Sequence, residues 1–238
     1  MEQQTGAWAV VAAYWDAAAD AFDEEPDHGL RDGRVRRAWA RRLAQWIPVA
    51  AADVLDVGCG TGSLSLLLGR AGHRVLGVDL SPRMVEAARA KAARAAVAAS
   101  FLVGDAAAPP TGSRRFDVVL ARHLLWTLPD PAAALSAWVG RLRPGGRLVL
   151  VEGRWGAAEG SAAPYGGAVG AALPWGSGVG AAELAGVVAS LPGEPRDVRT
   201  WSLTQDAEDF ALWGGEVSDE RFVLTARFAS PPGASGAC

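Results

Sequence analysis

The chain has 238 residues and a mass of 24.6 kDa, which allows one full domain with an appendage but not two large domains. Half of its residues are hydrophobic and 21% are charged, so it can bury a sizeable core and is not a disordered polymer. The net charge of -3 and the pI of about 5.7 argue against the broadly basic surface that binding to duplex DNA or structured RNA requires.

The cysteine and lysine content excludes further classes of protein. Cys59 and Cys238 provide neither a disulfide framework nor a metal knuckle, which is typical of a reducing compartment. Lys91, the single lysine, lies in an Ala/Arg-rich helical pattern, which excludes a Walker A loop and a pyridoxal-phosphate Schiff base. The start lacks the positive charge of a signal peptide, and the uncharged residues 160–182 are too rich in glycine and proline for a membrane span. We therefore expect a cytoplasmic protein without membrane association.

Two amphipathic helices are predicted in residues 1–48, which we interpret as an N-terminal helical cap. In residues 7–24, apolar side chains recur at spacings of three and four, as in Trp8, Val11, Trp15, Ala18 and Phe22. The second helix follows the EEPDHG break and carries the apolar positions Val35, Trp39, Leu43 and Trp46. Its arginines, within residues 31–42, are expected to form a solvated face turned toward the acidic residues 16–27. The alternative is an anion-binding rim for a carboxylate substrate.

From residue 52 onward, short apolar runs alternate with helical stretches, which predicts repeated βαβ units and a parallel sheet. The predicted strands are 54–57, 74–79, 101–104, 116–121, 147–152, 196–203 and 221–228. The predicted helices are 63–71, 82–96, 131–143, 181–191 and 206–213. Residues 49–229 are therefore expected to form one domain, and residues 230–238 a flexible tail. Within this domain, the Gly/Ala/Pro-rich residues 153–180 form a loop longer than a connection needs, which favours a functional, substrate-side role.

The sequence VLDVGCGTG at residues 54–62 places a glycine-rich turn directly between the first strand of this domain and its helix. Glycines let the backbone approach a ligand closely, at the strand ends where open α/β sheets bind ligands. Asp79 ends the next strand, 21 positions after Gly58, where a carboxylate can accept both hydroxyls of a ribose. Ser63 stands where a nicotinamide fingerprint needs its third glycine, and the acidic Asp56 precedes the turn. A cationic nucleoside, S-adenosylmethionine, is therefore favoured over a dinucleotide.

Five segments, in this order, closely resemble the class I S-adenosylmethionine-dependent methyltransferases, especially the bacterial small-molecule group. They are VLDVGCGTG (54–62), GVDLSPRMVEAAR (77–89), FLVGDA (101–106), FDVVLARHLLWTLPDP (116–131) and LRPGGRLVLVEG (142–153). The resemblance covers roughly residues 50–152. It implies a Rossmann-like α/β fold with a seven-stranded sheet, helices on both faces, and a final antiparallel hairpin formed by 196–203 and 221–228.

The resemblance also implies an activity and a set of cofactor contacts. The reaction would be methyl transfer from S-adenosylmethionine to the oxygen, nitrogen or carbon of a small acceptor, such as those of specialised metabolism, with S-adenosylhomocysteine as product. The residues expected at the methionine part are Gly58, Cys59, Gly60, Ala121 and Arg122. Those expected at the adenosine are Asp79, Leu80, Met84, Asp105 and Ala106. Tyr14 would close over the cofactor, while Asp56 would either act on the cofactor's charge or brace the turn.

The three histidines have no spacing typical of a metal site, so no catalytic metal is expected. His123 follows the strand that ends at Ala121, and an imidazole with a pKa near neutrality could remove the acceptor's proton there, giving a rate that rises between about pH 6 and 8. Alternatively, His123 orients Arg122 and the reaction proceeds by proximity alone. His28 is a second candidate for contact with the substrate.

Three other functions remain open at this stage. A peptide or an RNA could be the acceptor, although the acidic pI and the ARHLLW sequence after the fourth strand argue against RNA. A noncatalytic adenosine-binding module is a hypothesis of a different class. The sequence does not indicate the oligomeric state.

Overall fold

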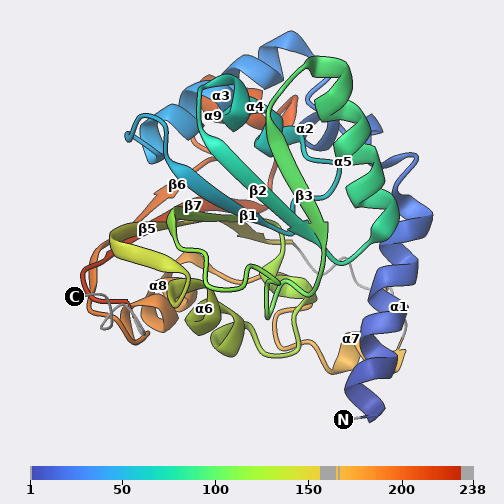
Figure 1. The fold of residues 1–238 in the computed structure, drawn as a ribbon, viewed down its shortest axis with the longest axis vertical. Coiled ribbons are helices and arrows are strands. Elements are labelled where there is room, and N and C mark those ends of the chain that lie inside the picture. The colour runs from blue at the N-terminus through green and yellow to red at the C-terminus, as the bar shows by residue number, and fades with distance from the viewer. Residues whose placement is uncertain (1, 156–164, 166, 232–238) are drawn as a thin grey trace.

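A single seven-stranded sheet organises the chain (Figure 1). The computed structural model describes residues 2–155, 165 and 167–231. The strand order is β3-β2-β1-β4-β5-β7-β6, with β1 to β5 parallel and β7 antiparallel to both β5 and β6. The strands are β1 Asp53–Val57, β2 Arg74–Asp79, β3 Ala99–Val103, β4 Phe116–Arg122, β5 Leu142–Arg154, β6 Pro195–Ser202 and β7 Glu220–Phe228. The predicted α/β fold, including its final antiparallel hairpin, is confirmed.

Helices cover both faces of this sheet (Figure 1). The α-helices are α1 Glu2–Ala18, α2 Pro26–Gly29, α3 Gly33–Trp46, α4 Ser63–Arg70, α5 Pro82–Ala95, α6 Pro131–Val139, α7 Gly167–Ala171, α8 Ala181–Ala189 and α9 Ala207–Trp213. Two short 3-10 helices are η1 Phe22–Glu24 and η2 Leu125–Thr127. None of the helices in the described part of the chain combines the length and apolar character that a bilayer crossing needs.

The two-residue period of the strands divides the core into two layers. Leu55 and Val57 of β1 pack with α6 and α8 on one face of the sheet. Val54, from the same strand, packs with α3, α4 and α9 on the opposite face. Because helices cover both faces of the sheet, the parallel strands consist of continuous apolar runs in the sequence. Their positions could therefore be predicted closely.

Strand β5 differs most from its predicted span. It begins at Leu142 rather than at 147, so the RPGG sequence at residues 143–146 lies within it. The register against β4 shifts between the pairs Phe116/Leu142 and Val118/Arg147. Gly145 has a φ of +78°, which only glycine adopts readily, so this residue allows the irregularity inside the strand.

The predicted N-terminal helix over 7–24 is wrong in its second half. Helix α1 begins at Glu2 and ends at Ala18, and η1 and α2 follow as separate short turns. Pro26 favours an extended conformation at the preceding residue, and Glu25 has φ -67° and ψ 134°. A continuous helix would have kept residues 7–24 on a single helical axis. Because the helix ends earlier, the acidic side chains of this segment can contact helix α5.

Three acidic side chains of this N-terminal segment bind helix α5. Asp16 accepts hydrogen bonds from Ser81 Oγ (2.5 Å) and the Arg83 amide (3.1 Å) at the start of the helix. Asp20 forms a bidentate pair with Arg83, with N–O distances of 2.7 and 2.8 Å. Asp23 lies 2.8 Å from Lys91 Nζ, which also donates to the hydroxyls of Thr61 and Ser63. The N-terminal segment is therefore attached both to α5 and to the glycine turn.

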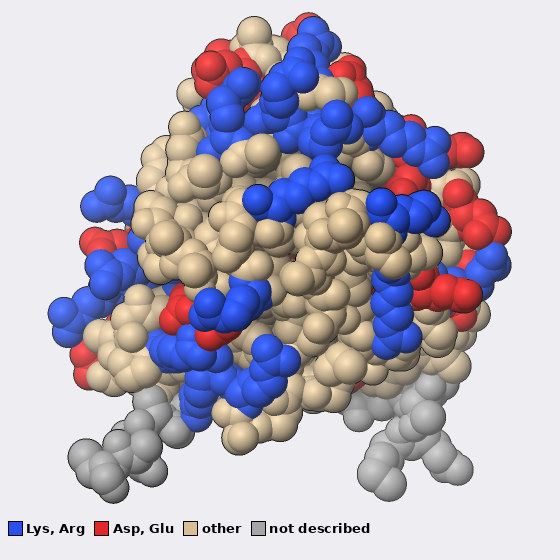
Figure 2. All heavy atoms as spheres, turned by 45° about the horizontal axis from the view of Figure 1, so that its top comes forward, with Lys and Arg blue, Asp and Glu red and all other residues tan. Residues whose placement is uncertain are grey.

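The expectation that the arginines of residues 31–42 face the acidic residues 16–27 is accordingly wrong, because the ion pairs described for Asp20 and Asp23 are with α5. Arg34, Arg37 and Arg41 of α3 are exposed. Basic side chains spread over this part of the surface, with acidic ones beside them at its margins (Figure 2).

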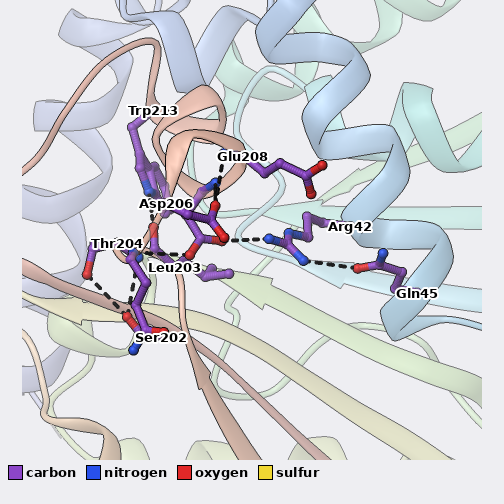
Figure 3. Close-up of polar contacts among 10 residues, drawn as sticks. Arg42, Gln45, Ser202, Leu203, Thr204, Asp206, Glu208 and Trp213 are labelled. Atoms are coloured by element: carbon purple, nitrogen blue, oxygen red, sulfur yellow. Dashed lines mark hydrogen bonds and ion pairs between the residues drawn. The ribbon is translucent and has the colours of Figure 1, made fainter.

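Another arginine of this group, Arg42, anchors helix α9. It donates to Asp209 at 2.7 Å, and Gln45 accepts a hydrogen bond from it (Figure 3). Asp206 caps α9 by accepting from two backbone amides, and Trp213 Nε1 donates to the Leu203 carbonyl at 2.8 Å (Figure 3). These contacts fix the indole of Trp213, which lies behind the cavity described below.

We expect Lys91→Met to lower the free energy of unfolding by about 1 to 3 kcal/mol, because it leaves the half-buried carboxylate of Asp23 without its cation. Arg83→Met, which breaks the more exposed pair with Asp20, should cost less than about 1 kcal/mol. Urea unfolding of both variants measures the difference. Equal losses would show that Lys91 is not the principal attachment of the N-terminal segment.

Candidate active site

A cavity of about 420 Å³ lies at the carboxyl edge of the sheet, within the size range of small-molecule sites. Its floor is formed by the glycine turn and by the ends of β2 and β4, next to the point where the strand order reverses. The N-terminal segment forms the opposite wall through residues of α1, η1 and α2. Segments distant in the sequence therefore enclose one space.

The glycine turn has no room for side chains. Gly58, Gly60 and Gly62 have φ values of +66°, +53° and +77°. A Cβ atom at Gly58 would lie 2.7 Å from Leu124, and one at Gly60 would lie 3.1 Å from the ring of Phe22. The turn thus requires glycine both for its backbone conformation and for the close approach of the surrounding walls.

Asp79 connects the turn to helix α5. Its Oδ2 accepts from the Gly60 amide at 2.8 Å, and its Oδ1 accepts from the Ser81 amide at 2.9 Å. Burial raises the pKa of Asp79, and these two amide hydrogen bonds act in the opposite direction. Each carboxylate oxygen has a second lone pair, and the residue lines the cavity, so Asp79 can also accept hydrogen bonds from a ligand there.

Asp56 lies below the turn and is almost fully buried. It accepts a hydrogen bond from Ser65 Oγ at 2.5 Å, and burial raises the pKa of Asp56 to about 6. This contact with α4 is the bracing role considered from the sequence. Because Asp56 also lines the cavity, a role in balancing the charge of a ligand stays a prediction.

The other residues predicted for the cofactor divide into two groups. Those that line the cavity are Gly58, Cys59, Gly60, Leu80, Met84, Ala106 and Arg122. Those outside its lining are Tyr14, Asp105 and Ala121. Tyr14 packs edge-on against Trp15, with ring centroids 5.1 Å apart, and it is Trp15 that reaches the cavity. Asp105 accepts from the Ala107 amide, and Ala121 is buried in the core.

Aromatic side chains supply much of the cavity wall. Those in the lining are Trp8, Trp15, Phe22, Trp126 and Trp155. Trp15 Nε1 donates to the hydroxyl of Tyr165 at 3.0 Å, and the Tyr165 ring stacks on Trp126 at 5.6 Å. Tyr165 thereby joins the predicted substrate-side loop, 153–180, to the N-terminal segment. Residues 156–164 and 166 of that loop, and 232–238 of the predicted tail, lie outside the described residues.

Both histidines predicted to contact the substrate line the cavity. His28 stacks on Phe22, with ring centroids 4.3 Å apart. His123 has a φ of +52° and packs against Trp155 and Trp213, at 4.6 and 5.6 Å. Burial, together with the nearby Arg122, Arg221 and His28, holds the pKa of His123 well below 6.5. This shift favours the neutral imidazole of His123 and argues against the predicted rise in rate between about pH 6 and 8.

Two further residues at the site were not identified from the sequence. Arg221 of β7 lines the cavity, and its guanidinium lies 4.4 Å from the Trp213 ring centroid and 5.7 Å from that of Trp155. Glu152 of β5 is fully buried behind the site, where its Oε1 accepts from the amides of Leu124 and Leu125 at 2.9 and 3.0 Å. Glu152 thus holds the segment that follows His123. Among the described residues, no group of His, Cys, Asp and Glu could hold a metal ion.

Part of the chain is similar to known methyltransferases. Residues 55–150 match the family model described as "Methyltransferase domain". Ubiquinone biosynthesis O-methyltransferase of Xanthomonas oryzae pv. oryzae is 37% identical over 145 residues, which are 60% of this chain and 56% of that protein. The protein of the same name from Xanthomonas axonopodis pv. citri matches to the same extent. The chain therefore spans about half the length of the curated relatives it matches.

Solved structures share the fold. N-methyltransferase NodS from Bradyrhizobium japonicum, in complex with S-adenosyl-L-homocysteine, has a TM-score of 0.61 and 19% identity, covering 90% of this chain and 98% of its own. The cyclase SpnF has a TM-score of 0.63 and 20% identity, covering 82% and 81%. At these identities the likeness shows the architecture alone, and the two proteins' different activities illustrate that a fold does not determine the reaction.

The pKa of Glu152 leads to a prediction about stability. Burial raises this pKa from 4.5 to about 7, so the folded chain keeps a proton that the unfolded chain loses above about pH 4.5. The free energy of unfolding of the wild type, relative to Glu152→Gln, should therefore fall as the pH rises from about 4.5 to about 7 and level off above that. Urea unfolding across this range measures the difference, with the exposed Glu216→Gln as the control for the substitution. A difference that does not change with pH would contradict the buried, titrating state of Glu152.

Proposed function

We propose that this chain transfers the methyl group of S-adenosylmethionine to a small-molecule acceptor, as the match of residues 55–150 to a methyltransferase domain supports. The observation that carries the proposal is the Asp79 carboxylate, held beside the glycine turn and facing the cavity. Two ribose hydroxyls can donate to it while its amide hydrogen bonds remain. The release of S-adenosylhomocysteine would complete the reaction.

The lining of the cavity fits this cofactor. Leu80 and Met84 are proposed to enclose the adenine together with Ala106, and the turn at Gly58, Cys59 and Gly60 to line the methionine part. When bound, the cofactor supplies a methyl group already activated by its sulfonium. The main tasks of the protein are therefore to orient the acceptor in line with that methyl group and to exclude water. The carboxylates of Asp56 and Asp79 suit a cationic ligand on this side.

The enclosure of the cavity supports a small acceptor over a peptide or RNA chain. The N-terminal segment, proposed as a cap over residues 1–48, is held across the cavity by Asp16, Asp20 and Asp23. A polymer would have to displace these contacts. His123, His28 and Arg122 are proposed to contact the reacting group, either to take its proton or to hold it as an anion. The scarcity of cysteine supports a cytoplasmic location. The resemblance of the sequence to bacterial small-molecule methyltransferases supports a bacterial source.

Asp79→Ala should weaken the binding of S-adenosylmethionine at least about tenfold, because two charge-assisted hydrogen bonds to the ribose are lost. Isothermal titration calorimetry measures the affinity, and a melting curve of the variant shows whether it is folded. Asp20→Ala, which removes a carboxylate that pairs with Arg83 outside the cavity lining, is the matched control and should bind normally. Unchanged affinity in Asp79→Ala would refute the assigned ribose site.

A second titration separates this function from that of a dehydrogenase. NADH should not bind to the wild-type chain, because the glycine turn lacks the third glycine of the dinucleotide fingerprint at Ser63. Binding of NADH with an affinity equal to that of S-adenosylmethionine would contradict the methyltransferase assignment.

A further inference from the structure

One end of the cavity is basic. Four side chains that can carry positive charge converge there: Arg122 at the end of β4, His123 directly after it, His28 of α2 and Arg221 of β7. Arg122, Arg221 and His28 each act electrostatically on His123, so these three groups lie around it. Asp56 and Asp79 lie toward the glycine turn. The cavity thus has two carboxylates at the turn, and both of its arginines lie at β4 and β7, beside Glu25 and Asp27.

Hydrogen-bonding atoms at the basic end lack partners. Among the described residues, Nδ1 of His28 and Nε2 of His123 are buried and form no hydrogen bond. Arg122 donates to the Asp27 carbonyl through Nη1, which leaves further N–H groups of its five available to the cavity. Because unpaired buried polar atoms are costly, their concentration here indicates a polar ligand, and the N–H groups of Arg122 require that ligand to supply acceptor atoms.

Carboxylates lie near both arginines, but in the described part of the chain none accepts a hydrogen bond from Arg122. Asp27 Oδ2 lies 4.0 Å from Arg122 Nη1 and 3.8 Å from His28 Nε2, beyond hydrogen-bond distance from both. Asp219 pairs with Arg221 at 2.9 Å, and Glu25 lines the cavity near His28. The groups acting on His123 are all cationic or cation-forming, and with burial they hold its pKa low. A neutral imidazole can still donate one hydrogen bond to an anionic oxygen.

Aromatic rings surround these groups. Trp155 packs against His123, and Arg221 lies over the rings of both Trp155 and Trp213. Phe22 stacks on His28. An aromatic body can therefore pack against these rings while its polar group reaches the donors of Arg122 and His123.

We propose that this end of the cavity binds an anionic oxygen group on an aromatic acceptor, with Arg122, His123 and His28 as the donors. The inference rests on the proposed function and specifies its substrate class. An oxygen that is already ionised has no proton to lose, so His123 holds the anion and is not needed as a base. The carboxylate of the cofactor is a second anionic group that the same donors can bind. The experiment distinguishes it from an anionic group on the acceptor.

The probes are benzoate and naphthoate, each compared with its neutral amide, in the presence of saturating S-adenosylhomocysteine at pH 7. Tryptophan fluorescence and calorimetry report binding. We expect each acid to bind the wild type at least about tenfold more tightly than its amide. In His123→Asn and Arg122→Met, the ratio of the Kd of the amide to the Kd of the acid should fall toward one. Asparagine tolerates the positive φ of residue 123, so this variant remains informative if Arg122→Met fails to fold. Arg83→Met, outside the cavity lining, should keep the preference.

The affinity for S-adenosylhomocysteine, measured on the same proteins, separates the possible failures. If the product binds but the wild type does not prefer the acids, or if no acid binds below about 10 mM, the anion site is refuted and the proposed function stands. If Arg122→Met loses affinity for the product and keeps the preference, Arg122 serves the cofactor's carboxylate and the inference is wrong. If the wild type does not bind the product at all, the proposed function fails as well.

Discussion

The position of Asp79 determines how the rest of the site is assembled. Its carboxylate accepts from the amides of Gly60 and Ser81, so one side chain sets the glycine turn against the start of α5. The hydroxyl of Ser81 in turn donates to Asp16, and Lys91 of the same helix binds Asp23. The N-terminal segment is therefore placed relative to the turn through α5, and both walls of the cavity depend on the end of β2.

The parts of this arrangement that could be predicted from sequence have local signals. The glycines of the turn and Asp79 lie within the one segment β1-α4-β2, and each parallel strand is marked by its own apolar run. Arg221, Glu152 and Trp213 carry no such signal, because their relation to His123 arises only when β4, β5, β7 and α9 pack together. Glu152 is one charged residue at the end of an apolar strand, and the sequence does not show which amides it will accept.

The N-terminal helix shows why a periodic pattern can mislead. The apolar spacing of residues 7–24 continues past Ala18, but the acidic residues between the apolar ones have partners on α5 that a straight helix does not satisfy. Ion pairs and a proline at residue 26 therefore override a helical periodicity that is weak by itself. The same contacts bring Phe22 and His28 to the cavity, so the departure from the predicted helix is what builds this wall.

The least favourable electrostatics in the described part of the chain is gathered around one space. Glu152 and Asp56 have raised pKa values, His123 has a lowered one, and two imidazole nitrogens lack partners. A structure selected for stability alone would fill such positions with apolar side chains, as it does along the rest of the sheet. A sulfonium bound near Asp56 and Asp79 and an anion bound near Arg122 would occupy the same cavity and attract each other. Because each ligand then improves the electrostatic surroundings of the other, binding of one is expected to favour binding of the other.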